Sequence, residues 1–347
     1  FYTFHAISYL VDVYRQKTPP QKNLLRLGLY LALFPKLVMG PIVPYHELEP
    51  ALAQRTIDAQ DASDGCFRFT IGLAKKALLA DALAGLVTGI WGDLASLTVL
   101  SAWLGLIGYA LQLYFDFSGY SDMAIGLGRM LGFRFPENFR YPYLCSSISD
   151  FWRRWHISLG SWFKEYLYFP LGGSRTGTLR TLRNLLLVWL ATGLWHGASW
   201  NYVLWGLYFG VLICLEKLLA PRFRAHPRKG LLAGLYRPVC LLLAVLGWVL
   251  FRAEDLPAAG RYFACLFGGA AGASAQARLY LHDFWPVLLL GAVGATPLCA
   301  KLVGRLGAKL RPGVRAAVQA VLVPALLACS TVWLLNGSFQ SFVYFQF

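Results

Sequence analysis

The chain alternates between long apolar segments and short polar ones, a pattern typical of a protein that crosses a membrane several times. One long uncharged stretch covers 184–215, where no Asp, Glu, Lys or Arg occurs. As one helix at ~1.5 Å per residue it would measure about 48 Å, well beyond the ~30 Å hydrocarbon core of a bilayer. The run therefore has to break, and the small and polar residues of 197–201 predict the break directly after His196.

Other apolar runs predict further membrane segments, at 1–13, 94–131, 241–249, 284–300 and 316–335. The run at 24–43 contains Pro35 and Lys36 and closes with Gly-Pro-Ile-Val-Pro. Irregular backbone at membrane depth is tolerated only where protein or water covers it, so we expect a broken or re-entrant segment here.

The polar segments between these runs are expected to be loops. The acidic stretch at 45–64 is predicted to be a loop with a helix start near its end. The following helix carries Lys75 and Lys76, which we expect on a solvated or headgroup-facing side. Two later segments are predicted to be a basic loop at 222–237 and a flexible loop at 268–275.

Composition supports a membrane protein. Hydrophobic residues make up 57% of the chain, charged residues 14%, and the mean hydropathy is +0.51. A soluble domain usually keeps about 25% charged residues. This chain lacks the polar surface to cover itself in water, so we predict an all-α polytopic membrane protein.

The net charge of +15 does not indicate nucleic-acid binding, because the basic residues lie between the apolar runs. Of the 32 Lys and Arg, 24 lie in four windows, at 15–36, 129–183, 222–237 and 301–315. Basic clusters beside membrane spans mark the cytoplasmic side and attract anionic headgroups. We therefore expect membrane lipid, and no nucleic acid, as a partner. The seven cysteines form no CxxC pair, so neither a disulfide framework nor a metal site is predicted.

The segment 132–183 is predicted to be a cytoplasmic loop that lies on the membrane interface. At 3.6 residues per turn, one face of a helix carries Phe151, Trp155, Leu159, Trp162 and Tyr166. Arg153 and Lys164 share another face. This pattern predicts an interfacial helix with its aromatic residues in the membrane and its cations among the headgroups. Asp150, which follows several serines, is expected at the N-cap.

Two carboxylates, Asp116 and Asp122, lie in or beside an apolar run. An unpaired charge in hydrocarbon costs about 2.5 kcal/mol or more. They are expected to form buried ion pairs with basic residues of the next loop, or to line a polar cavity.

Two histidines are candidates for chemistry, His196 inside the membrane and His156 in the interfacial loop. Imidazole can move a proton near neutral pH, and an apolar wall favours its neutral, basic form. The alternatives are a packing contact between helices for His196 and a simple interfacial role for His156. Basic residues at the cytoplasmic mouth are able to hold the phosphates of a donor, or they reflect membrane topology alone: Arg153, Arg154, Lys164 and Arg175.

Five segments resemble the membrane-bound O-acyltransferase family: DFSGYSD at 116–122, NFRYPY at 138–143, SDFWRRWHISLGSW at 149–162, YLYFPLGGSR at 166–175 and GLWHGASWNYVLWG at 193–206, with YFQF at 344–347. Together they look like the bacterial branch that includes alginate O-acetylation, D-alanyl transfer to teichoic acid, and peptidoglycan or cellulose acetylation. The resemblance implies one domain over 1–347, a helical bundle with re-entrant and interfacial helices around a central tunnel. It also implies further N-terminal spans that this sequence does not contain.

The resemblance identifies His196 as the family's near-invariant histidine, which acts as a general base on the acceptor hydroxyl or relays the acyl group. It places His156 at the family's second polar position, where it orients a substrate or shares the proton load. We expect the substrates to be bound by Asp150, Trp152, Arg153, Arg154, Trp195, Ser199 and Asn201. Asp150 is expected to act through the helix that places His156.

The implied donor is a cytosolic acyl thioester, either acetyl-CoA or an acyl carrier, with no bound cofactor or metal. The implied acceptor is an exported polysaccharide such as alginate, with periplasmic partner proteins, at a bacterial inner membrane. Three alternatives stay open: D-alanyl, peptidoglycan or cellulose acyl transfer by the same mechanism, a proton-coupled transporter, and a scaffold that recruits a periplasmic transferase. The lack of an internal repeat favours an enzyme over a transporter.

Overall fold

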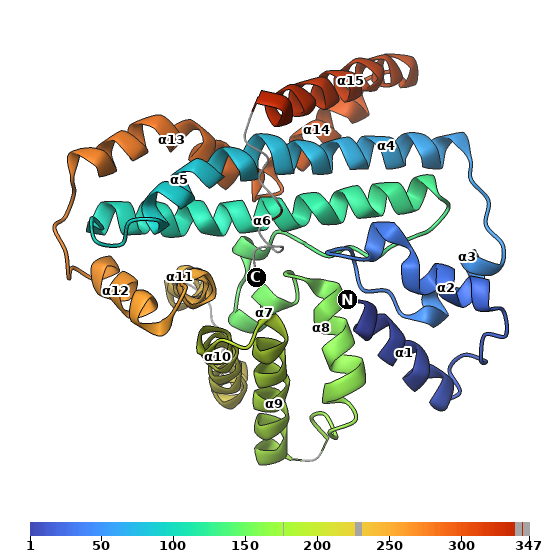
Figure 1. Ribbon diagram of the computed structural model, residues 1–347, viewed down its shortest axis with the longest axis horizontal. Helices are drawn as coiled ribbons and strands as arrows, with labels where there is room; N and C mark the ends of the chain where they lie inside the picture. The colour runs from blue at the N-terminus through green and yellow to red at the C-terminus, as the bar shows by residue number, and fades with distance from the viewer. Residues whose placement is uncertain (176, 226–230, 337–341, 343–347) are drawn as a thin grey trace.

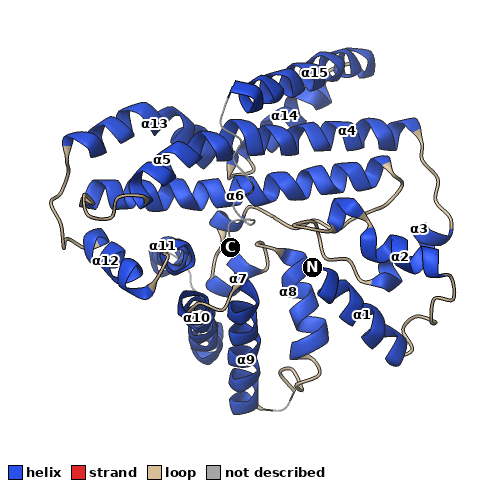
Figure 2. Ribbon diagram, in the orientation of Figure 1, coloured by secondary structure: helices blue, strands red, loops and turns tan. Residues whose placement is uncertain are grey.

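The computed structural model describes residues 1–175, 177–225, 231–336 and 342. All regular structure in these ranges is helical, which confirms the predicted all-α class (Figures 1 and 2). The YFQF motif that formed part of the family resemblance lies outside the described residues.

The N-terminal part consists of short helices and a 3-10 turn, α1 (Tyr2–Tyr14), α2 (Leu24–Ala32), η1 (Phe34–Lys36) and α3 (Tyr45–Ala53). The central part is one nearly continuous helix followed by a long one, α4 (Ala59–Ala74), the π-helix η2 (Lys75–Ala80), α5 (Asp81–Trp91) and α6 (Val99–Met130). The middle of the chain forms η3 (Pro142–Leu144), α7 (Ile148–Trp152), α8 (Ile157–Phe163), the π-helix η4 (Lys164–Tyr168), α9 (Thr178–His196) and α10 (Trp200–Ala225). The last helices are α11 (Leu231–Arg252), α12 (Leu256–Leu266), α13 (Ala275–Gly294), α14 (Leu298–Lys309) and α15 (Pro312–Asn336).

Helices α4 and α6 lie side by side across the middle of the molecule (Figure 1). On one side of this pair are α13, α14 and α15, and on the other are α1–α3 and α7–α12. Glycines allow the close approach of the central pair, because a Cβ added at Gly65 would lie 2.7 Å from the carbonyl oxygen of Gly126. Small residues at such crossings are typical of helices packed in a membrane.

The carboxylates of α6 are paired, but with the preceding helix rather than with the following loop. Lys76 Nζ lies 2.7 Å from both Asp116 Oδ1 and Asp81 Oδ1, and Lys75 Nζ lies 2.6 Å from Asp122 Oδ2. The prediction of a solvated or headgroup-facing side is therefore wrong for Lys76, which is only 5% exposed, whereas the side chain of Lys75 is 26% exposed. A buried carboxylate pairs with a cation on the helix packed against it. The order of the sequence does not show which helix that is.

The acidic stretch at 45–64 is largely helical instead of the predicted loop, although the helix start predicted near its end is confirmed. Its first half forms α3, which buries Tyr45, Leu48 and Leu52 on one face. Helix α4 begins after Asp58, whose Oδ1 accepts the Asp61 N–H at 2.6 Å. The many carboxylates made this stretch look like a loop. A few apolar residues at helical spacing were nevertheless enough to form a helix with one buried face.

By length and composition, four helices in the described part of the chain are able to cross a membrane, Val99–Met130, Trp200–Leu219, Gly234–Arg252 and Gly313–Asn336. The predicted span at 284–300 is interrupted, because α13 and α14 are bent by 67° about a short break. The predicted basic loop at 222–237 consists largely of the ends of α10 and α11, with 226–230 outside the described residues. The run at 24–43 is broken as expected, since α2 ends at Ala32.

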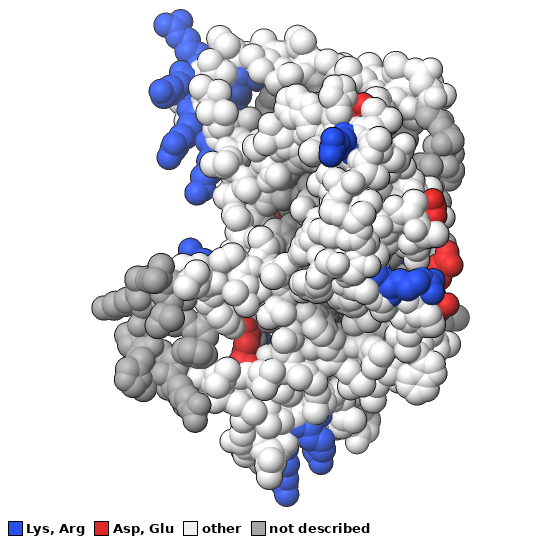
Figure 3. Space-filling view, turned by 90° about the vertical axis from the view of Figure 1, so that its left-hand side faces the viewer, with Lys and Arg blue, Asp and Glu red and all other residues white. Residues whose placement is uncertain are grey.

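One face of the molecule carries few charged side chains (Figure 3). Figure 3 shows a face that is largely uncharged, with Lys and Arg gathered near its edges. The protein is therefore able to contact lipid over this uncharged face and headgroups at its edges.

Candidate active site

His156 lies at a break between two short helices. Helix α7 ends at Trp152, α8 begins at Ile157, and His156 between them has a left-handed backbone with φ 47°. The predicted continuous interfacial helix is thus interrupted at this residue. A left-handed conformation is uncommon for a residue with a Cβ and often occurs where a side chain is held for a function.

The aromatic stripe of this segment packs inside the protein instead of dipping into the membrane. Phe151 is 0% exposed, and the ring of Trp155 lies 4.8 Å from that of Trp248 on α11. The prediction that these rings face lipid is wrong, because a period of 3.6 shows that a face is apolar but not what covers it.

The imidazole of His156 is buried, with a relative exposure of 4%. Its Nδ1 lies 3.2 Å from Oδ1 of Asn138, and its ring packs edge-on against Phe117 at 4.7 Å between centroids. Burial, and to a lesser degree the proximity of His196, holds the pKa of His156 well below its usual range. Within the described residues, Nε2 is buried without a hydrogen-bond partner.

His196 is the last residue of α9. The Gly197 N–H bonds to the Leu194 carbonyl, and α10 begins at Trp200, so the chain breaks where the sequence predicted. His196 is partly exposed, and aromatic rings pack around its imidazole. Its centroid lies 4.7 Å from Trp195, 5.0 Å from Trp205 and 5.1 Å from Phe251.

The two histidines come together from distant parts of the sequence. They lie close enough for a charge on His196 to disfavour a charge on His156. Phe1 also connects them. Its ring stacks on His156 at 6.3 Å and meets the edge of Trp195 at 5.6 Å, and Trp195 in turn contacts His196. The family resemblance implied two histidines acting together, and the fold brings them into one region.

A cavity of about 450 Å³ opens beside His156, between α7, α8, α9 and α10. Its walls are mostly apolar, with cationic groups from Arg153 and Lys164. Trp152 lines it as well, and so does Thr192, one helical turn before His196. Mostly apolar walls with a few polar groups are typical of a site for a small molecule.

Other predicted site residues have structural partners. Oδ2 of Asp150 accepts hydrogen bonds from the Ser146 N–H at 2.9 Å and from Arg154 Nε at 3.0 Å. The predicted N-cap is wrong, because Ser147 caps α7 and its hydroxyl accepts the Asp150 N–H at 2.9 Å. Neither Asp150 nor Arg154 lines the cavity described above.

The three predicted residues around His196 differ in their surroundings. Asn201 is buried and donates to the carbonyl of Ala253 at 2.6 Å, which ties α10 to the end of α11. Ser199 lies in the turn before α10, where its hydroxyl accepts the Asn201 N–H at 3.4 Å. The ring of Trp195 is in contact with His196.

Sequence reasoning missed three groups that position the site. Asn138, in the NFRYPY segment, contacts His156. Glu216 on α10 accepts hydrogen bonds from the first two N–H groups of α7. The third group is the pair Asp12 and His46. Only the position of Asn138 inside a quoted motif was a usable signal.

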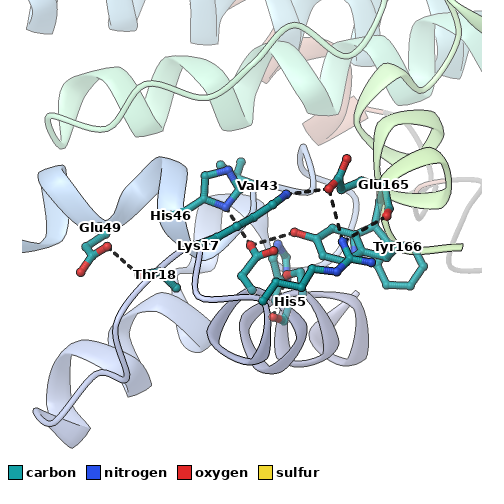
Figure 4. A network of polar contacts seen from close by, with 12 residues as sticks. His5, Lys17, Thr18, Val43, His46, Glu49, Glu165 and Tyr166 are labelled. Carbon is teal, nitrogen blue, oxygen red and sulfur yellow. Dashed lines mark hydrogen bonds and ion pairs between the residues drawn. The ribbon is translucent and has the colours of Figure 1, made fainter. Parts of the chain in front are cut away.

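The Asp12–His46 pair belongs to a polar network that fixes the segment after α8 (Figure 4). Oδ2 of Asp12 lies 2.7 Å from His46 Nδ1 and accepts the Tyr166 hydroxyl at 2.9 Å. Beside it, Lys17 Nζ lies 2.6 Å from Glu165 Oε1. Tyr166, predicted to face the membrane, is thereby held to α1 and α3. No group of His, Cys, Asp and Glu able to hold a metal ion occurs among the described residues.

Comparison with known proteins supplies the family. The family model described as membrane-bound O-acyltransferase matches residues 15–233, a range that contains both histidines. The chain is 47% identical over 271 residues to a probable alginate O-acetylase of Pseudomonas fluorescens, covering 77% of this chain and 53% of the relative. It is 40% identical over 377 residues to the probable alginate O-acetylase of Azotobacter vinelandii, covering 100% and 74%. A peptidoglycan O-acetyltransferase of Helicobacter pylori is 37% identical over 288 residues, covering 75% and 54%. The chain thus spans about half the length of most of these relatives.

Proposed function

The chain belongs to the membrane-bound O-acyltransferase family, and from this premise we propose that it transfers an acyl group from a thioester donor to a hydroxyl acceptor within the membrane. The observation that carries the proposal is that Phe1 connects His156, which lines a cavity of about 450 Å³, to Trp195, whose ring contacts His196. Two imidazoles in an apolar, aromatic surrounding are suited to proton transfer without a permanent charge.

In the proposed reaction, His196 is the general base. It accepts the proton of the acceptor hydroxyl as that oxygen attacks the thioester carbonyl carbon. The new C–O bond forms, the C–S bond breaks, and the leaving sulfur takes the proton back from the imidazolium. The products are an ester and a free thiol, and His196 returns to its neutral form. His156 orients the reactants or shares the proton with His196.

The cavity beside His156 is the proposed place for the donor thioester. Its apolar walls suit the extended arm that carries the thioester, and Arg153 and Lys164 are placed to bind donor phosphate groups. Acetyl-CoA and an acyl carrier both present such an arm with phosphate. We propose acetyl as the acyl group, because several relatives are named as O-acetylases or O-acetyltransferases.

The proposed acceptor is an exported polysaccharide such as alginate at a bacterial inner membrane, with periplasmic partner proteins. The names of the alginate-type relatives support this choice. D-alanyl transfer is the alternative acyl chemistry, and it is supported by a teichoic acid D-alanyltransferase of Bacillus subtilis that is 28% identical.

The test reconstitutes the full chain in liposomes and measures two activities on the same preparation. Acetyl transfer is followed as free thiol released from acetyl-CoA, or from an acetylated carrier protein, when mannuronate oligosaccharide is added. Proton flux is followed with a pH-sensitive dye inside the vesicles. Thiol release that depends on the oligosaccharide, without proton flux, supports the proposal. Proton flux without transfer from either donor contradicts it and favours a transporter.

A further inference from the structure

Asn138 is fully buried, with 0% exposure, and its side chain is bonded at both ends. Its Oδ1 accepts the Ser158 N–H at 3.2 Å and the Ser158 hydroxyl at 3.0 Å, and it lies 3.2 Å from His156 Nδ1. Its Nδ2 donates to the Ser121 hydroxyl at 3.1 Å. One amide therefore links α6, the first turn of α8 and the candidate catalytic imidazole.

The orientation of this amide follows from its partners. The backbone N–H of Ser158 is only a donor, so the atom facing it has to be the oxygen of Asn138. The same oxygen faces Nδ1 of His156, and an amide oxygen only accepts. Nδ1 of His156 therefore carries the hydrogen. In a neutral imidazole this leaves the lone pair on Nε2.

The backbone of Asn138 holds the same turn. Its carbonyl accepts the Ile157 N–H at 3.0 Å, directly after the left-handed His156. The first two N–H groups of α8 are thus satisfied by Asn138 from another segment, not by a side chain at the N-cap. This arrangement fixes the direction of the His156 side chain as well as its tautomer.

We propose that Asn138 is a positioning residue that holds His156 in the Nδ1–H tautomer, so that Nε2 is the atom that accepts a proton beside the cavity. Three observations support it: Nε2 is buried without a partner among the described residues, His156 lines the cavity, and His196 is near. The inference rests on the proposed function, because it names the atom through which His156 shares the proton load.

The proton balance is simple. A proton from a reacting group goes to Nε2, Nδ1 keeps its hydrogen and its bond to Asn138, and Nε2 later returns the proton. The amide of Asn138 gains and loses nothing. Since the amide is neutral, it orients the ring without stabilising the imidazolium as a carboxylate would.

A direct test needs no activity. The full chain is labelled with ¹⁵N-histidine, placed in lipid bilayers at pH 7.5 and studied by solid-state NMR, with His156→Gln to assign the signals. We expect a protonated Nδ1 and an unprotonated Nε2 for His156. The opposite tautomer would overturn the inference, whereas failure of the proposed function would appear separately, as wild-type protein without acyl transfer.

A second test uses the pH profile of transfer. Asn138→Asp keeps the acceptor oxygen but adds a negative charge, which favours the imidazolium. We expect the acid limb of kcat/KM to move up by about 1 to 2 pH units. The matched control is Asn184→Asp, at a buried amide that bonds the carbonyls of Leu171 and Gly173 and not a histidine. Its acid limb should stay in place. An unmoved acid limb in active Asn138→Asp protein would mean that Asn138 is only structural, and if this variant does not fold, the NMR result decides.

Discussion

Glu216 on α10 accepts hydrogen bonds from both the backbone N–H and the hydroxyl of Ser149, at 2.8 and 2.6 Å, in the first turn of α7. The same carboxylate accepts the Ile148 N–H at 2.6 Å and the Tyr236 hydroxyl at 2.5 Å. Unpaired N–H groups and the helix dipole make a helix start a favourable place for a carboxylate. Helix α10 thereby fixes α7, whose last residue, Trp152, lines the cavity.

Removal of this carboxylate should destabilise the protein. Glu216→Ala leaves several donors in a partly buried place without their acceptor, at a cost of about 2 kcal/mol or more. Thermal unfolding of the protein in nanodiscs should show a lower midpoint than for the wild type. Glu254 is exposed, so Glu254→Ala serves as the control and should leave the midpoint unchanged. Equal midpoints for both variants would contradict this role of Glu216.

Lys76, the buried cation of the central helices, should contribute more to the stability of the protein than Glu216 does. Lys76→Met removes the positive charge that lies 2.7 Å from both Asp116 and Asp81. Breaking a buried ion pair from one side costs about 3 to 5 kcal/mol. We expect little folded protein in a size-exclusion assay of detergent extracts. Lys217→Met, at an exposed lysine, should give wild-type yields; normal yields for Lys76→Met would show that the pair is not required.

The close contact beside His196 should not tolerate a methyl group. A Cβ added at Gly193 on α9 would overlap the carbonyl oxygen of Tyr202 on α10. Gly193→Ala should push the two helices apart and move His196, and misplacement by about 1 Å can lower a rate by roughly 100-fold. A Cβ at Gly304 meets no atom within 4 Å, so Gly304→Ala is the control in the same transfer assay. Full activity in Gly193→Ala would contradict this packing.

The pH dependence follows from the lowered pKa of His156, which burial causes. The folded protein keeps this imidazole neutral at pH values where an unfolded chain, with a pKa of ~6.5, is already protonated. Its contribution to stability is therefore complete above about pH 6.5 and is lost as the pH falls toward the folded-state pKa. His156→Gln should flatten the fall in thermal midpoint below pH 6.5. An unchanged slope would show that His156 titrates normally.

The helical class and the break after His196 were predictable from the sequence, whereas the idea that the two histidines act together came from the family resemblance. Uncharged length forces a break, and glycine with polar residues shows where it lies. The burial of Phe151 and Trp155 inside the protein was not predictable, because an aromatic face of a helix can pack against lipid or against other helices. The partners of Asp116 and Asp122 were missed for a related reason, since ion pairs across packed helices depend on which helices meet.

The left-handed conformation of His156 had no local signal. Neither glycine nor asparagine marks the turn, and the conformation is held by Asn138 from another segment. The role of Glu216 was not predictable either, because the sequence does not show that a carboxylate on one helix bonds to the N-terminus of another helix. Residues that position a site from distant parts of the sequence can be recognised only when the fold is known.

The central claim is that His196 performs proton transfer in acyl transfer. The most direct measurement compares His196→Ala with His282→Ala in nanodiscs, as thiol release from acetyl-CoA or acetylated carrier protein with mannuronate oligosaccharide. His282 is a suitable control because its side chain is 82% exposed and lies on α13, away from the cavity. We predict that His196→Ala lowers kcat by at least about 100-fold with an unchanged unfolding midpoint, since positioned proton transfer contributes about 10²–10⁴-fold. His282→Ala should retain wild-type activity. Full transfer by folded His196→Ala protein would contradict the account.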